Sequence, residues 1–374
     1  MRPLYHLLDP IWRRFPFPAG HTFESTPFED ATVLRMARTY RGREILPVYC
    51  YAVGDTLVDS GISSVGDEVA DAARKARIAR VVLTHHHEDH SGNAALLASR
   101  GAEVLATAPG VRLVAHDLPR RFYQHVLWGE ADPVAAREVP AEVPLGRLTA
   151  RVVPASGHSV DQLALHVPER GWLLSGDAFA AERVKVFRGD EDFYESCETL
   201  ERFLTLDFDA LLCAHRPRFT GGKDAIRAKL AWLRELEGRV KESRARGRSV
   251  RRIVRELGIE PSSAFFTITF GDVTTANLVR SITTARGRGS RWSGRSRPRV
   301  EEGGGPPSAA RRGARLDPGQ RHSRCICIRF AGFHGMRLVF MIQATHVKSY
   351  SFEMRPTPAQ PPLTLFIRPH SVLI

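Results

Sequence analysis

The sequence predicts an α+β protein in which two β-sheets pack face to face and helices cover their outer surfaces. Two features support this fold class. Short apolar runs with strand periodicity alternate with segments whose apolar residues recur at helical spacing. Turns rich in glycine and charged residues separate these segments, as expected between the elements of a compact domain. A core of about 220 residues is large enough to form one stable domain.

The elements follow one another in a regular order. The first three strands are expected to form successive hairpins, because Arg41-Gly42-Arg43 and Gly54-Asp55 lie between them. The expected strands are residues 33–40, 45–52, 56–59, 79–83, 102–107, 148–153, 171–174 and 208–213. Helices are expected over residues 65–78 and 194–206, each with apolar side chains along one face.

From Asp224 to Ile282 the pattern is helical. One helix is expected to end at Gly247, a second covers residues 250–257 before Gly258, and a third covers 274–282. These helices are expected to pack on the sandwich. A nucleic-acid-binding module is the less favoured alternative, because Glu256 and an apolar stripe interleave with its arginines, which are Arg248, Arg251, Arg252 and Arg255.

The strongest chemical signal is a loop with four histidines and two carboxylates, Thr84-His85-His86-His87-Glu88-Asp89-His90, directly after an apolar run. Neutral imidazoles and carboxylates are the ligands that hold zinc and similar divalent ions. His85 and His87 can face one ion, while Asp89 and His90 face another. The intervening His86 and Glu88 are not expected to be ligands. A histidine-rich loop alone is only suggestive, so further ligands are required downstream.

Three such residues follow strand-like runs further along the chain. His158 lies in Ser156-Gly157-His158-Ser159, Asp177 in Ser175-Gly176-Asp177-Ala178, and His215 in Ala214-His215-Arg216-Pro217. A single histidine or aspartate of this kind is more often structural. Repetition of the same arrangement after several strands favours a metal site.

Five ordered motifs together resemble the metallo-β-lactamase-fold hydrolase superfamily over about residues 33–220. They are Leu57-Val58-Asp59-Ser60-Gly61, the loop from His85 to His90, Gly157-His158-Ser159, Ser175-Gly176-Asp177 and Ala214-His215. The resemblance implies a four-layer αββα sandwich with a C-terminal helical extension. It points to the glyoxalase II or lactonase-like branch, with the subfamily left open. After His158 the chain reads Ser-Val-Asp-Gln, where glyoxalase II enzymes usually have Thr-Pro-Gly-His.

The same resemblance implies a set of ligands for two divalent metal ions. The first ion would be held by His85, His87 and His158, the second by Asp89, His90 and His215, and Asp177 would bridge both. Asp59 resembles the family's carboxylate that orients a ligand histidine through its other ring nitrogen. Nitrogen and oxygen ligands favour zinc, with manganese or iron as alternatives.

The expected function is that of a binuclear metal-dependent hydrolase, in which a metal-bridging hydroxide cleaves an ester, thioester or lactone of a small molecule. Asp89 and Asp177 are the predicted catalytic residues, and Asp89 would orient the nucleophile and pass a proton to the leaving group. Arg183, Arg188 and Tyr194 are predicted to bind substrate. The alternative is a nucleic-acid or cyclic-nucleotide phosphodiesterase. Only 38 positions separate Asp177 from His215, which leaves no room for the inserted domain of the nuclease branch.

Charge divides the chain into unequal parts. The net charge is +13, but residues 286–374 carry 16 Arg+Lys against 4 Asp+Glu, a net of +12. The predicted domains are an N-terminal extension (1–32), the catalytic domain (33–220), the helical extension (221–285) and a basic, low-complexity, largely disordered tail (286–374). Nucleic acid is not an expected partner of the nearly neutral catalytic unit, although the basic tail leaves that partner open.

Localisation is predicted to be cytoplasmic. The first twelve residues contain Arg2, His6 and Asp9, which interrupt any apolar stretch of a secretory signal. No run approaches the roughly 18 apolar residues needed to span a bilayer. Five cysteines without framework spacing fit a reducing compartment.

Overall fold

The structure is a computed structural model that describes residues 19–259, 269, 271–284, 325–330, 338–343, 350–355 and 364–369. The chain divides into two compact units, Met1–Ser293 and Gly294–Ile374. Each unit is described by itself. Residues 1–18 of the predicted N-terminal extension and most of the predicted tail lie outside the described residues.

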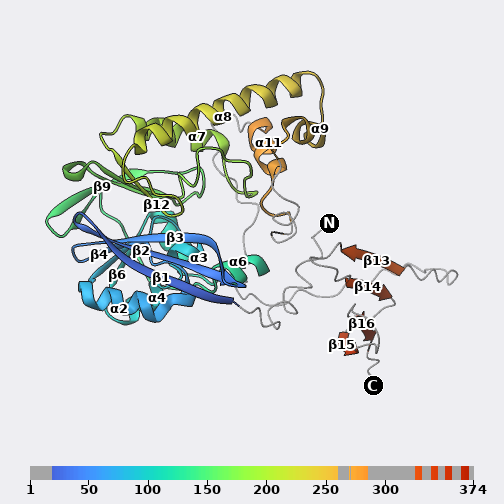
Figure 1. Ribbon diagram of the computed structural model, residues 1–374, viewed down its shortest axis with the longest axis horizontal. Helices are drawn as coiled ribbons and strands as arrows, with labels where there is room; N and C mark the ends of the chain where they lie inside the picture. Colours follow the sequence, from blue (N-terminus) through green and yellow to red (C-terminus); the bar gives the residue numbers. More distant parts are fainter. Residues whose placement is uncertain are drawn as a thin grey trace, which may run out of the picture. The chain divides into compact units, whose positions relative to one another are not determined.

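The first unit contains a seven-stranded sheet whose strand order follows the sequence (Figure 1). Strands β1 to β4 pair antiparallel, and β4 to β7 pair parallel. The strands are β1 (Ala19–Phe28), β2 (Ala31–Tyr40), β3 (Arg43–Val53), β4 (Thr56–Val58), β5 (Arg80–Val82), β6 (Glu103–Ala106) and β7 (Arg137–Glu138). The predicted hairpins between residues 33 and 59 are therefore confirmed.

A five-stranded sheet with the order β12-β11-β10-β9-β8 packs against it. All its pairs are antiparallel except β11 and β12, which run parallel. The strands are β8 (Glu142–Leu145), β9 (Leu148–Pro154), β10 (Leu163–Val167), β11 (Trp172–Gly176) and β12 (Ala210–Cys213).

Alternate side chains of each strand enter different cores, because successive strand residues point to opposite faces of a sheet. Val58 and Leu174 pack in the core between the two sheets. Their neighbours Leu57 and Leu173 pack on the outer faces, against the helices. Strands buried on both faces explain why β10, β11 and β12 are buried at every position and read as continuous apolar runs.

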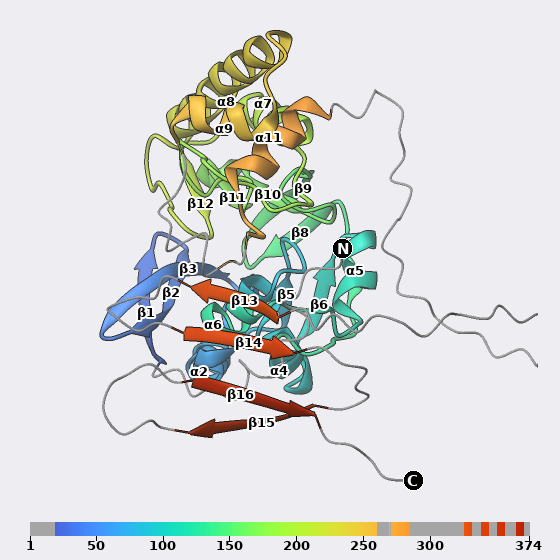
Figure 2. The ribbon, with the colours of Figure 1, turned by 90° about the vertical axis from the view of Figure 1, so that its right-hand side faces the viewer.

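Helices cover both outer faces and complete four layers in the order αββα (Figures 1 and 2). This arrangement confirms the predicted fold class. On the first sheet lie α2 (Gly66–Ala76), α4 (Ala94–Ser99) and α5 (Ala108–Val114), with the short α3 (Glu88–Ser91) and α6 (Phe122–Leu127) nearby. On the second sheet lie α7 (Phe193–Leu204) and α8 (Gly222–Ala245), and α9 (Val250–Leu257) and α11 (Thr275–Thr283) pack against these two helices (Figure 1).

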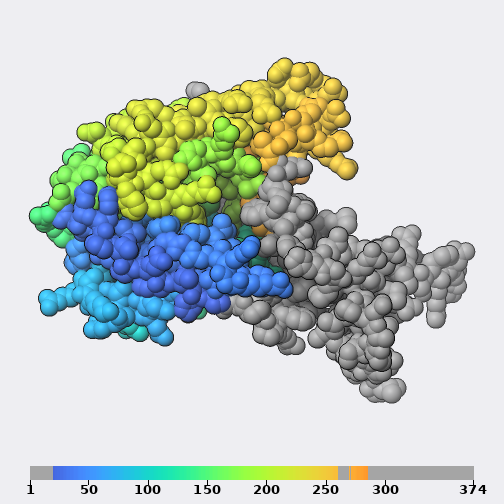
Figure 3. Space-filling model, in the orientation of Figure 1, coloured from blue at the N-terminus to red at the C-terminus, as the bar shows by residue number. Residues whose placement is uncertain are grey.

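The helices of the extension share a buried core with α7 and the second sheet. The apolar stripe of α9, including Ile253 and Val254, is buried in the core shared with α7, α8 and α11. Ser249 accepts a hydrogen bond from the backbone N–H of Arg252 and caps α9, a contact that contributes about 1 kcal/mol. Arg251, Arg252 and Arg255 of α9 are exposed, and so is Arg248, which precedes the helix. In the space-filling view, α8 (yellow) lies along the top of the first unit (Figure 3).

The structure differs from the prediction at the N-terminal side of the sandwich. Strand β1 lies in the region predicted as an extension before residue 33, yet all ten of its residues pair with β2. Its sequence alternates weakly, with Thr, Ser and Glu beside Phe, so its strand periodicity is hard to recognise. The sheet therefore begins before residue 33.

The second unit contains a four-stranded sheet with the order β13-β14-β16-β15. The strands are β13 (Cys325–Phe330), β14 (Leu338–Gln343), β15 (Tyr350–Arg355) and β16 (Thr364–Pro369). These four segments lie in the region predicted as a basic, low-complexity, largely disordered tail, and each combines β-branched or aromatic residues over six positions. No helix of the described residues is long and apolar enough to cross a membrane.

Candidate metal centre

The predicted ligands follow strands of both sheets. Asp59 directly follows β4, and His85 lies three residues after β5. Asp177 directly follows β11, and His215 lies two residues after β12. Since β4 pairs parallel with β5, and β11 with β12, the carboxyl ends of each pair lie at one sheet edge. Because the two sheets pack face to face, Asp59 and His215, which are 156 positions apart in the sequence, lie in one site.

Glycine at position 176 is required for Asp177 to reach this site. Gly176 has φ +48°, in the left-handed region, and a Cβ there would lie 2.7 Å from Thr84 Oγ1. The turn after β11 therefore contacts the start of the histidine loop directly. Any larger residue would push apart the two segments that carry the ligands.

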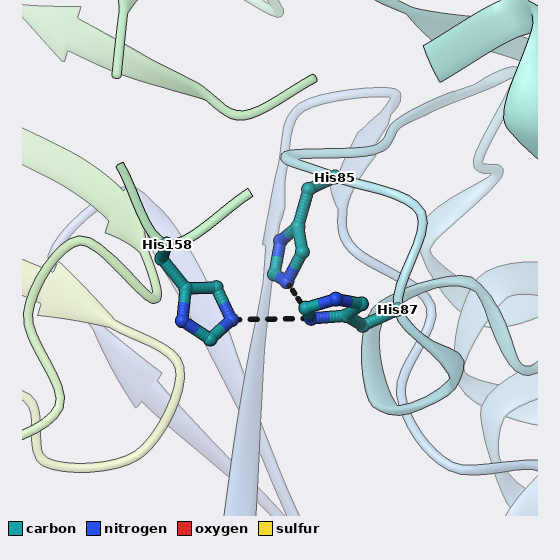
Figure 4. A group of neighbouring side chains, drawn as sticks. All are labelled: His85, His87 and His158. Carbon is teal, nitrogen blue, oxygen red and sulfur yellow. Dashed lines mark hydrogen bonds between the residues drawn. The ribbon is translucent and has the colours of Figure 1, made fainter. Parts of the chain in front are cut away.

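Three histidines converge in what we call the histidine cluster, His85, His87 and His158. His87 Nδ1 lies 2.8 Å from His85 Nε2 and 3.1 Å from His158 Nε2 (Figure 4). A neutral imidazole carries one N–H and one lone pair, so three converging ring nitrogens cannot satisfy one another. A cation that accepts lone pairs from all three fits this arrangement.

The remaining four predicted ligands form the aspartate cluster, Asp89, His90, Asp177 and His215. His215 Nε2 lies 3.2 Å from Asp177 Oδ2 and 3.4 Å from Asp89 Oδ2. Asp177 Oδ2 also lies 3.6 Å from His158 Nε2, so this carboxylate stands between the two clusters. Within the described part of the chain, His90 Nε2 and Asp177 Oδ1 are buried without a hydrogen-bond partner. Such buried polar atoms are costly unless something binds them, so the residues fit two divalent ions.

The electrostatics differ between the clusters. Burial holds the pKa of His85 and His87 well below the ordinary value, so both rings are neutral. In the aspartate cluster burial alone would lower the pKa of His90, but Asp59, Asp89 and Asp177 raise it well above its usual range. Asp177 likewise raises the pKa of His215, against the effect of burial. His90 and His215 are therefore protonated without metal. Burial would raise the pKa of Asp177, yet these two histidines hold it well below its usual range.

Each cluster histidine except His87 has a partner for its other ring nitrogen, which fixes the direction of the ring. Asp59 accepts from His90 Nδ1 at 2.8 Å, as the sequence resemblance implied. The other three partners were not predicted. Glu191 Oε2 accepts from His158 Nδ1 at 3.2 Å, the carbonyl of Pro47 from His215 Nδ1 at 3.0 Å, and Thr84 Oγ1 from His85 Nδ1 at 3.1 Å.

The two other acidic or basic side chains of the loop lie outside both clusters, as expected. His86 Nδ1 lies 2.9 Å from Asp161 Oδ1, and Glu88 is buried, which raises its pKa. Asp161 was not predicted. It stands in the Ser-Val-Asp-Gln stretch after His158, where the sequence departs from the glyoxalase II pattern.

A cavity of about 810 Å³ opens beside the two clusters. His87, His158, Asp177 and His215 line it, together with the aromatic side chains of Tyr123 and Trp128. Two of the predicted substrate residues, Arg183 and Arg188, also line this cavity. Tyr194 does not: it lies on α7, and its hydroxyl donates to the carbonyl of Ile282 at 3.2 Å. The structure therefore places Tyr194 in the packing of α7 against α11, apart from the other two predicted substrate residues.

Comparison with known proteins is consistent with these geometries. Residues 43–215 match the family model described as "Metallo-beta-lactamase superfamily". The chain is 30% identical over 156 residues to hydroxyacylglutathione hydrolase of Rhodobacter capsulatus, covering 41% of this chain and 54% of that protein. It is 29% identical over 174 residues to a beta-lactamase-like protein 2 homolog of Drosophila melanogaster, covering 43% and 52%. The chain thus spans about half the length of these curated relatives.

Among solved structures, a beta-lactamase domain protein from Burkholderia ambifaria is similar, with a TM-score of 0.48 and 22% identity. That similarity covers 76% of this chain and 94% of the other. The family match includes Asp59, the loop from His85 to His90, His158, Asp177 and His215. Residues 43–215, a little under half of the chain, match the metallo-beta-lactamase superfamily model and include the His-x-His-x-Asp-His loop and the side chains of both clusters.

Proposed function

We propose that this protein is a binuclear metal-dependent hydrolase that cleaves a thioester, ester or lactone in a small molecule. The observation that carries the proposal is the convergence of seven candidate ligand side chains in two adjoining clusters, five of which line the 810 Å³ cavity. A cavity of this size suits a small-molecule substrate. Several relatives named hydroxyacylglutathione hydrolase favour a thioester as the bond cleaved.

Zinc is the ion that we propose for both clusters. All seven side chains offer imidazole nitrogens or carboxylate oxygens, and five of the seven are histidines. This donor set suits zinc, while harder ions such as magnesium prefer oxygen ligands alone. Manganese and iron are alternatives that metal analysis distinguishes.

The mechanism that we propose uses the residues around both clusters. Two divalent ions there would lower the pKa of a water and polarise the carbonyl under attack. Asp177 fixes the clusters relative to each other. Despite burial, His90 keeps the pKa of Asp89 below its ordinary value, so the carboxylate is ionised. Asp89 can therefore orient a water through one oxygen and carry its proton to the leaving group.

The cavity wall indicates an anionic substrate. Arg183, Lys185 and Arg188 line it, and Arg188 keeps 22% of its side chain exposed although it lies beside His87 and Glu88. Its nearest carboxylate, Asp190 Oδ1, is 3.4 Å from Nε, without a hydrogen bond. Guanidinium groups bind carboxylates through paired N–H donors. We propose Arg188 as the residue that binds a carboxylate of the substrate.

The charge of the sandwich argues against a polyanionic substrate. Residues 19–220 carry 22 Arg+Lys against 29 Asp+Glu, a net of −7. Proteins that bind nucleic acid gain much of their affinity from neutralising phosphates with basic side chains. A phosphodiesterase for nucleic acid is therefore the weaker alternative.

Metal analysis of the purified full chain, followed by turnover assays, tests the proposal. The panel contains a hydroxyacylglutathione thioester, a lactone and bis(p-nitrophenyl) phosphate. We expect about two ions per chain and turnover of the thioester or lactone. Turnover of the phosphodiester alone, or a metal-free inert protein, would overturn the proposal. Arg188→Met should raise KM for an anionic thioester by about 10- to 100-fold, since hydrogen bonds to charged groups contribute about 1.5–3 kcal/mol. Arg147→Met, on the surface beside Asp30, is the matched control.

A further inference from the structure

The segment from Ala178 to Glu191 connects β11 to α7 and forms one wall of the cavity. It contains no helix or strand of its own, yet it begins beside Asp177 and ends at Glu191, the partner of His158. Side chains and backbone groups from the helical extension hold this segment from behind. That extension begins after the residues that match the family model.

Helix α8 holds the segment at two points. Lys229 Nζ donates to the carbonyl of Ala178 at 2.7 Å, and Trp232 Nε1 donates to the carbonyl of Val184 at 2.8 Å. Residues three apart on a helix share a face, so both contacts come from one side of α8. The guanidinium of Arg183 also lies over the Trp232 ring, 5.6 Å from its centroid.

Helix α11 holds the rest of the segment. Asn277 Nδ2 donates to the carbonyl of Phe187 at 3.2 Å, and Thr275 Oγ1 donates to that of Lys185 at 2.9 Å. The backbones of Phe187 and Thr274 exchange hydrogen bonds of 3.1 and 2.9 Å. At the far end, Ser281 Oγ donates to the carbonyl of Glu191 at 3.1 Å. The backbone of this wall is thus bonded to α8 and α11 along most of its length.

Lys229 is an unusual residue for a purely structural contact. Its side chain is buried, with 7% exposure, and it lines the cavity. No carboxylate in the described part of the chain lies within ion-pairing distance of it. A buried ammonium without an acidic partner is costly, and burial accordingly lowers the pKa of its amine. An apolar residue at this position would avoid that cost, unless the hydrogen bond to Ala178 is needed.

We propose that the α8–α11 extension is a working part of the active site, with two separable roles. Lys229 is a positioning residue that holds the turn after Asp177 and so the direction of that carboxylate. Trp232 and Asn277 hold the wall that carries Arg183 and Arg188. The second role rests on the proposed function, while the first concerns metal binding alone.

Two variants of the full chain separate these roles. Lys229→Met keeps the apolar stem and removes the donor, and we expect a loss of about 10-fold or more in affinity for the second metal ion, as for other residues that orient ligands. Its kcat should fall with KM nearly unchanged. Trp232→Phe keeps a ring and removes the N–H. For it we expect a several-fold rise in KM, unchanged metal affinity and faster amide hydrogen exchange over residues 182–188.

Each variant has a matched control in the same chain. Lys223 lies on α8 as Lys229 does. Each Nζ is 5.8 Å from the centroid of an aromatic ring, that of Phe208 for Lys223 and that of Phe179 for Lys229. Lys223→Met therefore removes a similar ammonium without touching the wall. Trp172→Phe removes an indole N–H that has no hydrogen-bond partner among the described residues. Lys229→Gln, which can still donate to the Ala178 carbonyl, should recover most of the metal affinity that Lys229→Met loses.

Metal affinity is measured by competition with a chromogenic chelator, and hydrogen exchange by mass spectrometry. Neither readout needs a substrate. An inert protein that shows both effects would contradict the proposed function and the substrate-related part of the second role, but it would leave the positioning role of Lys229 standing. If Lys229→Met binds both ions as Lys223→Met does, the positioning role is wrong. If Trp232→Phe leaves exchange over residues 182–188 equal to that of Trp172→Phe, the wall is held by other means and the second role is wrong. A Lys229→Met variant that does not fold moves the first test to Lys229→Gln. The affinity of Lys229→Gln for the second ion should then stay within about threefold of that of the unchanged protein.

Discussion

Replacing Asp59 by asparagine should weaken one metal cluster and leave the other intact. Asp59 is buried, with 3% exposure, and its two oxygens accept three hydrogen bonds. Oδ1 accepts from the backbone N–H of Thr84 at 2.7 Å. Oδ2 accepts from the Thr84 hydroxyl at 2.9 Å and from His90 Nδ1 at 2.8 Å. These bonds hold one proton of His90 on Nδ1, so the proton that an entering metal ion displaces is the one on Nε2.

Asparagine has nearly the same shape but only one acceptor oxygen. If that oxygen keeps the bond from the Thr84 backbone, the amide NH₂ faces His90 Nδ1. Two donors then meet, and His90 relieves the conflict by moving its proton to Nε2, the nitrogen that a metal ion requires. Loss of such an orienting partner typically costs 10- to 100-fold in metal affinity, which corresponds to about 1.4–2.7 kcal/mol. The histidine cluster does not use His90, so its affinity should stay within about twofold.

Competition with a chelator, fitted to two dissociation constants, measures this effect. Asp161→Asn is the matched control, because Asp161 is also buried and contacts a histidine Nδ1, at 2.9 Å, but that histidine is His86, outside both clusters. The control should lose stability without changing either dissociation constant. Equal weakening of both ions by Asp59→Asn, or no weakening at all, would refute the proposed role of Asp59.

Three further predictions follow from the same clusters and from the chain's charge. The pKa values of His90 and His215 are raised in the metal-free protein, so a cation entering the aspartate cluster must displace their protons, whereas His85 and His87 are already neutral. The metal affinity of the aspartate cluster should therefore rise with pH up to those raised pKa values, and metal binding there should release more protons than binding at the histidine cluster. Calorimetry in buffers of different ionisation enthalpy measures the number of protons released. Equal proton release at both clusters would contradict the prediction. Asp177→Ala should lose the second ion and nearly all turnover, and retention of both ions by metal analysis would speak against a bridging role. A chain truncated after Ala285 should keep both ions and its thioester or lactone turnover, because the seven ligands lie before that point; loss of solubility or activity on truncation would show that the tail contributes.

The residues of the two clusters could be predicted from the sequence because each lies in a local pattern. A buried strand ends, a small residue allows the turn, and a histidine or aspartate follows, as in Gly176-Asp177. Such patterns need no knowledge of distant contacts. The same locality explains why helices with caps and stripes, such as α9, were found close to their true bounds.

The residues that orient the ligands could not be predicted in the same way. Glu191 stands between Asp190 and Asp192, and nothing in this acidic run distinguishes the residue that meets His158. Pro47 acts through a backbone carbonyl, which has no sequence signal at all. Strand β1 was not predicted for a related reason. Its backbone pairing with β2 defines it as a strand, whereas its own sequence has little strand periodicity.

Lys229 and Trp232 show the general consequence of this difference. On the sequence they belong to an amphipathic helix and look like ordinary positions of its buried face. In the fold that face lies behind the cavity wall, so one lysine and one tryptophan reach backbone carbonyls next to Asp177 and Arg183. A local pattern can therefore identify which atoms bind a metal ion. How firmly those atoms are held depends on tertiary contacts, and in this protein the contacts come from a helix that begins after the residues matching the family model.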